Sequence, residues 1–469
     1  MLAQGASQWQ CSYHKTNCSR VGQLELRTPG EQMRDRRRFL IYLLLFLFLC
    51  IYSLDRVTMG VAGSTVAKEL HIGPVALGYL FSSYLWLYAV LLLPVGALTD
   101  RVGTRWMSAV AAGMWSVSQA LGGLATSLAF LLCTRLGLGV FESAANPCAH
   151  RAIREWTPRR ERGLATAIWY SGTTAGPALG SPLVAWLITH HGWRSAFIVT
   201  GAIGLVWVAI WLPVYRAPDR ARWLSTSERE MILRERDVSL EAQGDSVGYR
   251  GLLTTNSTMW GLAITQGCIN YTAYFFLAWL PGFLQSAYHL TVLQAGSYTA
   301  VPFALSTILA LGVSHACDRM LSPAALREGK RRHAVALGAL LSGTIVLVPY
   351  VGSINLATVV LTVSLTFNTF AQSMNFALTN DRLRTTGDVG RAYAFFTLGG
   401  ITFGIMGPIV TGYLVSLTGN FTVALVLCGA LCVLAAVLVS TLTQHPMGEG
   451  VIRKVGLSDM ATEIGARNR

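Results

Sequence analysis

The sequence predicts an all-α membrane protein with twelve spans in two groups of six. Of its 469 residues, 52% are hydrophobic and only 13% are charged, which is too apolar for a soluble chain of this length. A helix needs about 20 apolar residues to cross a bilayer core of about 30 Å. Runs of that kind occur at 39–61, 75–98, 105–126, 128–150, 163–190, 194–214, 257–285, 292–313, 334–351, 355–379, 391–417 and 420–442.

The basic residues lie in alternate loops, and this pattern predicts the orientation. Arginine and lysine are frequent in both tails, in the central linker and in every second loop, whereas the other side has little beyond Lys68 and Arg194. By the positive-inside rule, both termini should be cytoplasmic in a plasma (inner) membrane. The formal charge of +14 then reflects topology and contact with the lipid bilayer, and no nucleic-acid partner is expected.

Composition divides the chain into five parts. We expect a polar, disordered tail at 1–38, a six-helix bundle at 39–215, a cytoplasmic linker at 216–256, a second bundle at 257–442 and a cytoplasmic tail at 443–469. The first tail holds Cys11, His14 and Cys18, fewer ligands than the four of a structural zinc, so no metal site is expected.

An internal repeat relates the fifth and eleventh spans. Small residues match at an offset of 227, as Gly163/Gly390, Ala165/Ala392, Ala167/Ala394, Gly172/Gly399, Gly180/Gly407 and Gly192/Gly419. Two parallel six-helix repeats are typical of a transporter whose site lies at the midplane between them.

Charged residues inside the apolar spans are the first candidates for that site. Asp55 and Arg56 follow sixteen apolar and small residues, and the fourth span carries Arg135 and Glu142. Such charges are costly in a membrane and normally mark an ion or substrate pathway. The planar fork of Arg56 can bind a carboxylate, although it could instead only neutralise Asp55.

Asp55 and Glu142 are candidate proton carriers, with Arg135 and Arg56 modulating them. At 1.5 Å per residue, Asp55 should lie about 24 Å from the inner face and Glu142 about 21 Å below the outer face. We therefore expect an outer and a deeper carboxyl group on one coupling path.

The loop after the second span resembles the signature loop of the major facilitator superfamily. It reads Gly96-Ala-Leu-Thr-Asp100-Arg101-Val-Gly103-Thr-Arg105, and a degenerate copy ends in Asp318-Arg319. In that family the loop latches conformations without touching substrate. The resemblance implies the major facilitator fold.

Four further stretches resemble the anion:cation symporter family, which includes galactonate, glucarate and phthalate-type permeases. They are Leu54-Asp55-Arg56-Val57, Tyr88, Arg135 to Glu142 with Pro158 to Gly163, and Asn270 to Pro281. The resemblance implies uptake of a small organic anion, such as a sugar acid or other carboxylate, with protons by alternating access. Sodium coupling stays open, and no cofactor is implied.

Candidate substrate ligands come from both halves. They are Arg56, Tyr88, Asn270, Tyr271, Tyr274, Gln372 and Asn375, although polar residues in a bundle can also bond between helices. Sugar-acid members of the family carry Gln where this chain has Thr173, and Asn near Thr397 or Ile401. These departures favour a less hydroxylated or aromatic carboxylate.

Two alternatives stay open. The first is an exporter, because the fifth span resembles the glycine-proline pattern of antiporters at Gly163, Gly172, Gly176-Pro177 and Gly180. The second is a membrane sensor that does not transport. No nucleophile–base spacing or phosphate loop indicates an enzyme. We expect a monomer.

Overall fold

The computed structural model describes residues 36–236, 248–254, 257–383 and 389–447, and over these ranges the chain forms helices with one isolated β-bridge between Leu383 and Met447. The predicted all-α membrane class is confirmed. The expectations for the first tail and its Cys11, His14 and Cys18, and for residues after 447, lie outside the described residues.

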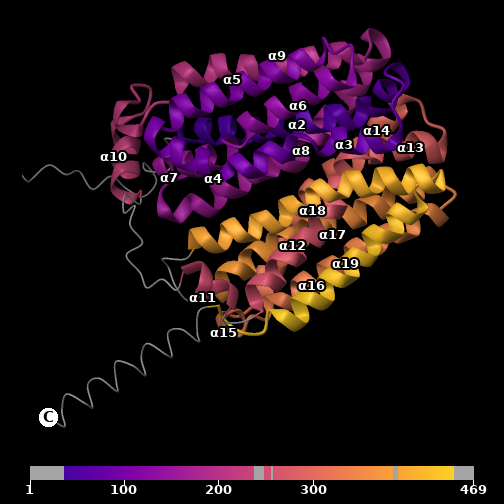
Figure 1. The fold of residues 1–469 in the computed structure, drawn as a ribbon. Helices are drawn as coiled ribbons and strands as arrows, with labels where there is room; N and C mark the ends of the chain where they lie inside the picture. Colours follow the sequence, from indigo (N-terminus) through magenta and orange to yellow (C-terminus); the bar gives the residue numbers. More distant parts are fainter. Residues whose placement is uncertain (1–35, 237–247, 255–256, 384–388, 448–469) are drawn as a thin grey trace, which may run out of the picture.

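Two helix bundles lie side by side, joined by the linker (Figure 1). The first contains α2 (Phe39–Glu69), α3 (Pro74–Ser82), α4 (Tyr84–Val102), α5 (Thr104–Gly122), α6 (Leu128–Glu142), α7 (Ala145–Trp156), α8 (Arg162–His191) and α9 (Trp193–Val214). The linker contains α10 (Thr226–Glu235) and α11 (Gly248–Thr254). The second bundle contains α12 (Thr258–Ala278), α13 (Leu280–Tyr288), α14 (Val292–Met320), α16 (Arg331–Ser342) with the 3-10 helix η3 (Gly343–Tyr350), α17 (Ile354–Arg382), α18 (Val389–Thr418) and α19 (Thr422–Leu442), with the short α15 (Pro323–Arg327) between α14 and α16.

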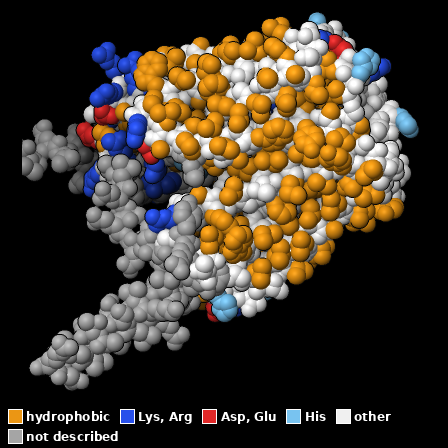
Figure 2. Space-filling view, in the orientation of Figure 1, with side chains coloured by type: hydrophobic (Ala, Val, Ile, Leu, Met, Phe, Trp, Pro, Cys, Tyr) orange, Lys and Arg blue, Asp and Glu red, His pale blue; other side chains and the backbone are white. Residues whose placement is uncertain are grey.

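Nine segments of the described chain are long and apolar enough to cross a membrane. Three of the twelve predicted spans are not among these nine, and they correspond to α5, α8 and the α12–α13 pair. The twelve-span prediction is compatible with the fold, and hydrophobic side chains cover the long flank of both bundles (Figure 2).

Helices α8 and α18 show how the two bundles repeat. Their bounds differ by 227 residues at both ends, and each is followed by a glycine with positive φ, Gly192 at 80° and Gly419 at 72°. A Cβ on Gly172 would lie 2.9 Å from the Phe46 carbonyl oxygen of α2, and one on Gly399 would lie 2.4 Å from that of Ala263 in α12. Matched glycines of α8 and α18 thus contact Phe46 of α2 and Ala263 of α12, which are 217 residues apart. The repeat therefore also relates α2 to α12.

One matched position reverses the sizes of its two residues. In the first bundle, Gly176 of α8 packs on the backbone of Cys50 in α2. In the second bundle, the equivalent residues are Phe403 of α18 and Gly267 of α12, and a Cβ on Gly267 would lie 2.5 Å from the Phe403 ring. The glycine lies on α8 in the first bundle and on α12 in the second, and the two helices pack closely in both bundles.

The bundles approach each other most closely at the end opposite the linker, which we call the far end. A Cβ on Gly60 of α2 would lie 2.4 Å from the Leu277 oxygen of α12, its own repeat equivalent. A Cβ on Gly78 of α3 would lie 2.5 Å from the Pro408 oxygen of α18. The matching crossing of α14 with α8 places Gly296 2.8 Å from the Ser181 oxygen by the same measure.

At the other end, which we call the linker end, the ribbons of the two bundles diverge, and α10 lies against the first bundle (Figure 1). Arg38, just before α2, donates to both oxygens of Glu161 at 2.8 Å and to Glu228 of α10 at 2.7 Å. The Trp223 ring stacks on Trp156 with centroids 5.2 Å apart. A buried ion pair therefore holds α10 to the first bundle, and an aromatic stack holds the segment just before it.

Candidate functional site

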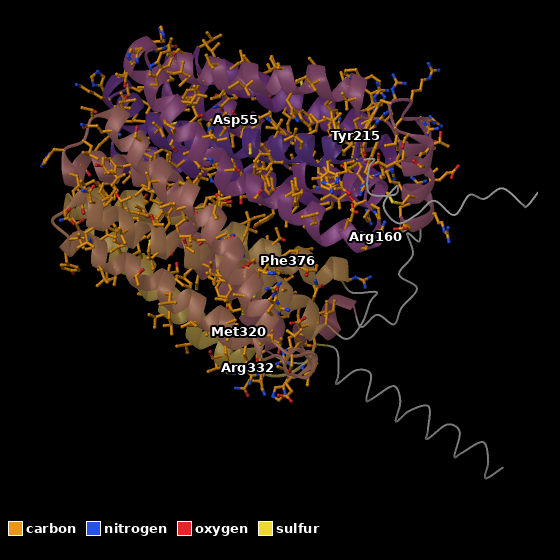
Figure 3. All side chains as sticks on the ribbon, turned by 180° about the vertical axis from the view of Figure 1, so that it is seen from behind. Asp55, Arg160, Tyr215, Met320, Arg332 and Phe376 are labelled. Atoms are coloured by element: carbon orange, nitrogen blue, oxygen red, sulfur yellow. The ribbon has the colours of Figure 1, made fainter. Side chains whose placement is uncertain are left out.

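Asp55 lies in the interior of the first bundle, between the two ends of α2 (Figure 3). Its neighbour Arg56 donates from Nε and Nη2 to the same oxygen of Glu142, at 3.1 and 2.8 Å. Nη2 also donates to the hydroxyl of Tyr52, one helical turn earlier on α2. Arg56 is 9% exposed and Glu142 is fully buried, so water screens this ion pair little.

Three tyrosine rings surround the Arg56 guanidinium. Its carbon lies 3.7 Å from the ring centroid of Tyr52, 4.5 Å from that of Tyr84 and 5.7 Å from that of Tyr88. Cation–π attraction stabilises an arginine in such surroundings, by up to about 2 kcal/mol when water is excluded. The second oxygen of Glu142 has no hydrogen-bond partner among the described residues.

The Asp55 carboxyl group is fully buried, and neither of its oxygens has a hydrogen-bond partner within the described ranges. Arg135 approaches the backbone of Asp55 instead, donating to its carbonyl oxygen at 3.3 Å. The same Arg135 nitrogen donates to Gln119 at 3.1 Å, and Gln119 donates to Thr200 at 3.0 Å. Arg135 is thus held by the Asp55 carbonyl of α2 and by Gln119 of α5, and within the described ranges it makes no hydrogen bond to either carboxyl group.

The predicted depth separation of the two acidic residues is wrong. Glu142 bonds directly to the residue that follows Asp55. The estimate assumed that α2 starts at the inner face, but its 31 residues rise about 46 Å, more than the bilayer core requires. A helix of this length need not start at the inner face, so the count from Phe39 does not give the depth of Asp55.

Helix interruptions position these side chains. Glu142 is the last residue of α6, and a turn at Ser143 and Ala144 separates it from α7. Tyr84 starts α4 after a break at Ser83. A Cβ on Gly139 would collide with the Tyr84 carbonyl, so only glycine lets α6 approach this break closely enough to bring Glu142 to Arg56.

Tyr88 and Tyr274 extend the site toward the second bundle. Asn146 donates to the Tyr88 hydroxyl at 2.8 Å. Tyr274 of α12 packs against the first bundle's core, which includes Tyr52, Tyr84 and Tyr88, although it belongs to the other bundle. Of the second-half candidates, Tyr274 is therefore the one that the contacts place beside the charged site.

Most other second-half candidates bond within their own bundle. Asn375 is fully buried and donates to Gln266 at 3.1 Å, and Gln266 donates to Asn270 at 3.2 Å. Gln372 donates to Asn368 at 2.8 Å. Tyr271 is 3% exposed, and its hydroxyl has no partner in the described part of the chain.

The signature-loop residues form a separate network at the linker end. Gly103, with φ of 88°, makes the turn from α4 to α5, whereas Gly96 lies inside α4, and Arg101 is exposed in its last turn. Arg105 donates to the Leu212 carbonyl at 2.7 Å. Asp100 pairs with Arg151 at 3.4 Å.

The degenerate copy of this loop forms ion pairs of its own. Asp318, next to Arg319 in the last turn of α14, pairs with Arg331 at 2.8 Å, and Arg331 also pairs with Asp381. Neither loop reaches the Arg56 site, in agreement with a structural role.

Of the tyrosines around Arg56, only Tyr88 was predicted. The hydrogen bond between Arg135 and Gln119 was not predicted either. Tyr52 precedes Arg56 by four residues, and Tyr84 precedes Tyr88 by four, so each pair shares a helix face. That spacing could have indicated an aromatic lining. Gln119 is one of several polar residues in the third span, and nothing in its spacing marked it as a partner of Arg135.

Residues 44–389 match the Major Facilitator Superfamily model. The D-galactonate transporter of Escherichia coli O6:H1 is 31% identical over 86% of this chain and 94% of its own length. The probable L-galactonate transporter of E. coli K12 is 30% identical over 87% and 89%. The probable galactarate/D-glucarate transporter of Bacillus subtilis is 30% identical over 91% and 96%.

Solved structures show the same fold at lower identity. A bacterial homologue of the human lysosomal transporter Spinster, in an inward-facing and occupied conformation, superposes with a TM-score of 0.66 at 16% identity, covering 86% of this chain and 96% of that one. With the matched domain, the relatives and the helical architecture, the predicted resemblance is confirmed. The chain is a multi-pass membrane transporter rather than an enzyme, and it belongs to the major facilitator superfamily.

Proposed function

We propose that this protein takes up a small organic anion together with protons, by alternating access. The observation that carries the proposal is the Arg56–Glu142 pair inside its ring of tyrosines. Nε and Nη2 of Arg56 donate to one Glu142 oxygen, and the same edge of the guanidinium could hold a substrate carboxylate through both of its oxygens. Substrate would therefore compete with Glu142 for the same N–H groups.

Competition of this kind couples substrate to protons. When substrate occupies Arg56, Glu142 loses its cationic partner while still buried, and a buried unpaired carboxylate is strongly disfavoured. Uptake of a proton by Glu142 removes that cost. Asp55, buried without a hydrogen-bond partner in the described chain, is the second group proposed to bind a proton.

The substrate class rests on the relatives and on the residues around Arg56. Relatives of about 30% identity are named as galactonate and galactarate/glucarate transporters, which supports a carboxylate substrate. Thr173 donates to the Tyr170 carbonyl of its own helix, and Ile401 is apolar, so these positions offer fewer side-chain hydrogen bonds than Gln and Asn would. We propose a carboxylate with fewer hydroxyl groups than an aldonate, or an aromatic one.

The glycine crossings at the far end support alternating access. They hold the bundles together there while the ribbons diverge at the linker end (Figure 1). With the linker end placed in the cytoplasm by the positive-inside rule, this arrangement is closed to the outside. We propose an inner-membrane location, cytoplasmic termini and a functional monomer, because the charged site lies within one chain.

The packing of α8 is compatible with either direction of transport. Gly172, Gly176 and Gly180 all contact α2, and a Cβ on any of them would lie 2.9 Å or less from an α2 atom. These glycines are explained by close helix packing, whichever way the substrate moves.

Proteoliposome uptake tests the proposal. Purified protein is first screened by thermal shift against a panel of aldonates, dicarboxylates and aromatic carboxylates, and a stabilising compound is used as the radiolabelled substrate. We expect accumulation with an inward proton gradient, and none with a sodium gradient alone. Expulsion of preloaded substrate by the same proton gradient, without uptake, would replace this proposal with the exporter.

A further inference from the structure

A pocket of about 560 Å³ lies at the linker end of the first bundle, away from the Arg56 site. It is lined by Arg36, Arg37, Leu40, Pro213, Val214 and Trp223. The residues come from the start of α2, the end of α9 and the linker before α10. Its size falls in the range of small-ligand pockets.

Two cationic side chains form one edge of the pocket. Arg36 and Arg37 are both exposed, and Arg37 donates to the Trp223 carbonyl at 2.6 Å, which fixes its guanidinium against the pocket wall. The nearby Glu228 accepts from the backbone N–H groups of Arg37 and Arg38 and pairs with the Arg38 guanidinium, which also pairs with Glu161.

The rest of the wall is apolar. At the end of α9, the carbonyl oxygens of Leu212 and Val214 accept hydrogen bonds from Arg105 and from the Trp223 indole. With these acceptors engaged, Leu40, Pro213, Val214 and the Trp223 ring present mainly carbon to the pocket. An occupant must therefore combine an anionic group with an apolar part.

The pocket continues onto the outer surface of α2. Leu40 is 41% exposed, and Leu43 and Leu47 are 49% and 39% exposed at helical spacing on the same face. This stripe runs from the arginines toward the bilayer core, because Phe39 starts the apolar run of α2. A hydrocarbon chain lying along it would stay in the membrane, with its charged end at Arg36 and Arg37.

We propose that this pocket binds one anionic phospholipid, with its phosphate at Arg36 and Arg37 and an acyl chain along Leu40, Leu43 and Leu47. Two arginine forks suit a phosphate ester, and tryptophan is common where membrane proteins meet the lipid headgroups. The site is distinct from the proposed transport site and does not depend on which anion is transported.

Titration of phosphatidylglycerol into the full chain in a neutral maltoside detergent tests this, with bound lipid counted by native mass spectrometry. Detergent removes the charged membrane surface, so binding reports the pocket. The Arg36→Gln/Arg37→Gln double variant removes both guanidinium groups from the pocket and should bind at least tenfold more weakly. Arg36→Glu alone, which leaves the Arg37–Trp223 contact intact, should lose at least tenfold.

The matched control is Arg216→Gln/Arg222→Gln, which removes the same charge from exposed arginines that do not line the pocket. We expect it to bind within threefold of the parent protein. Equal losses in both double variants would overturn the proposal in favour of general electrostatic attraction. Equal binding of phosphatidylcholine, or equal thermal stabilisation by inorganic phosphate alone, would also overturn it.

Discussion

Replacing Glu142 with glutamine should tighten anion binding and abolish proton-driven accumulation. In the parent protein, a substrate must displace a carboxylate that accepts two N–H groups of Arg56, at 3.1 and 2.8 Å. A hydrogen bond to a charged group contributes about 1.5–3 kcal/mol, toward the upper end when both partners are ionised, as here, and toward the lower end when only the arginine is. The neutral amide should therefore compete less strongly, by about 1–1.5 kcal/mol, giving about five- to tenfold tighter binding.

Glutamine is the informative substitution because its amide oxygen can still accept from Arg56. Alanine would leave the guanidinium buried without its acceptor, at a cost of about 3–5 kcal/mol, and would confuse folding with binding. Binding is measured by calorimetry with a substrate found in the carboxylate panel, and transport by uptake with and without a pH gradient. Exchange of labelled for unlabelled substrate should persist, since it needs no net proton movement.

Glu69→Gln is the control, because Glu69 also pairs with an arginine, Arg194 at 2.5 Å, but at the far end of the bundle. It should leave affinity within twofold of the parent value. Unchanged or weaker binding in Glu142→Gln, with proton-driven uptake intact, would refute both the competition at Arg56 and the proposed role of Glu142.

Three further predictions concern the tyrosines, the far end and the linker end. Tyr52→Phe should weaken anion binding about three- to tenfold in calorimetry, because the Tyr52 hydroxyl accepts a hydrogen bond from Arg56. Tyr84→Phe should change anion binding less than twofold, because the Tyr84 hydroxyl has no partner among the described residues. Equal effects of the two substitutions would contradict this prediction. Gly60→Ala should open the far end, seen as at least twofold faster thiol labelling of a cysteine introduced there, whereas Gly113→Ala, whose Cβ meets no atom within 4 Å, should not. The hydrogen bond from the buried Arg38 holds the pKa of Glu161 below its usual 4.5. The Glu161 carboxylate therefore stabilises the fold above pH 4.5, and this stabilisation is lost as the pH falls through the lower pKa of the folded protein. Melting temperatures measured between pH 6 and 3 should fall more steeply for the parent than for Glu161→Gln.

The helices and the charged residues could be predicted because each depends on local chemistry. A long apolar run has to be helical in a membrane, and the charges of Asp55 and Glu142 are too costly there to be incidental. The Arg56–Glu142 contact could not be predicted, since it depends on where α2 enters the membrane and on the break after Glu142.

The tyrosines and the second-half polar residues illustrate the same limit. Tyr52 and Tyr84 read as ordinary members of apolar runs, and only the fold places their rings over Arg56. Asn375 and Gln372 looked like substrate ligands because they are polar, but their hydrogen bonds are made within the second bundle. Polarity in one span does not reveal whether a partner helix already satisfies it.

The reversed glycine positions restrict how the two halves could be recombined. Exchanging α8 and α18 alone would place Gly176 against Gly267, leaving a void, and Phe403 against Cys50, where the helices approach too closely for a ring. Exchanging the α2–α8 pair as a unit for the α12–α18 pair would preserve both contacts. The two helices of each pair are therefore matched to each other, and chimeras should keep them together.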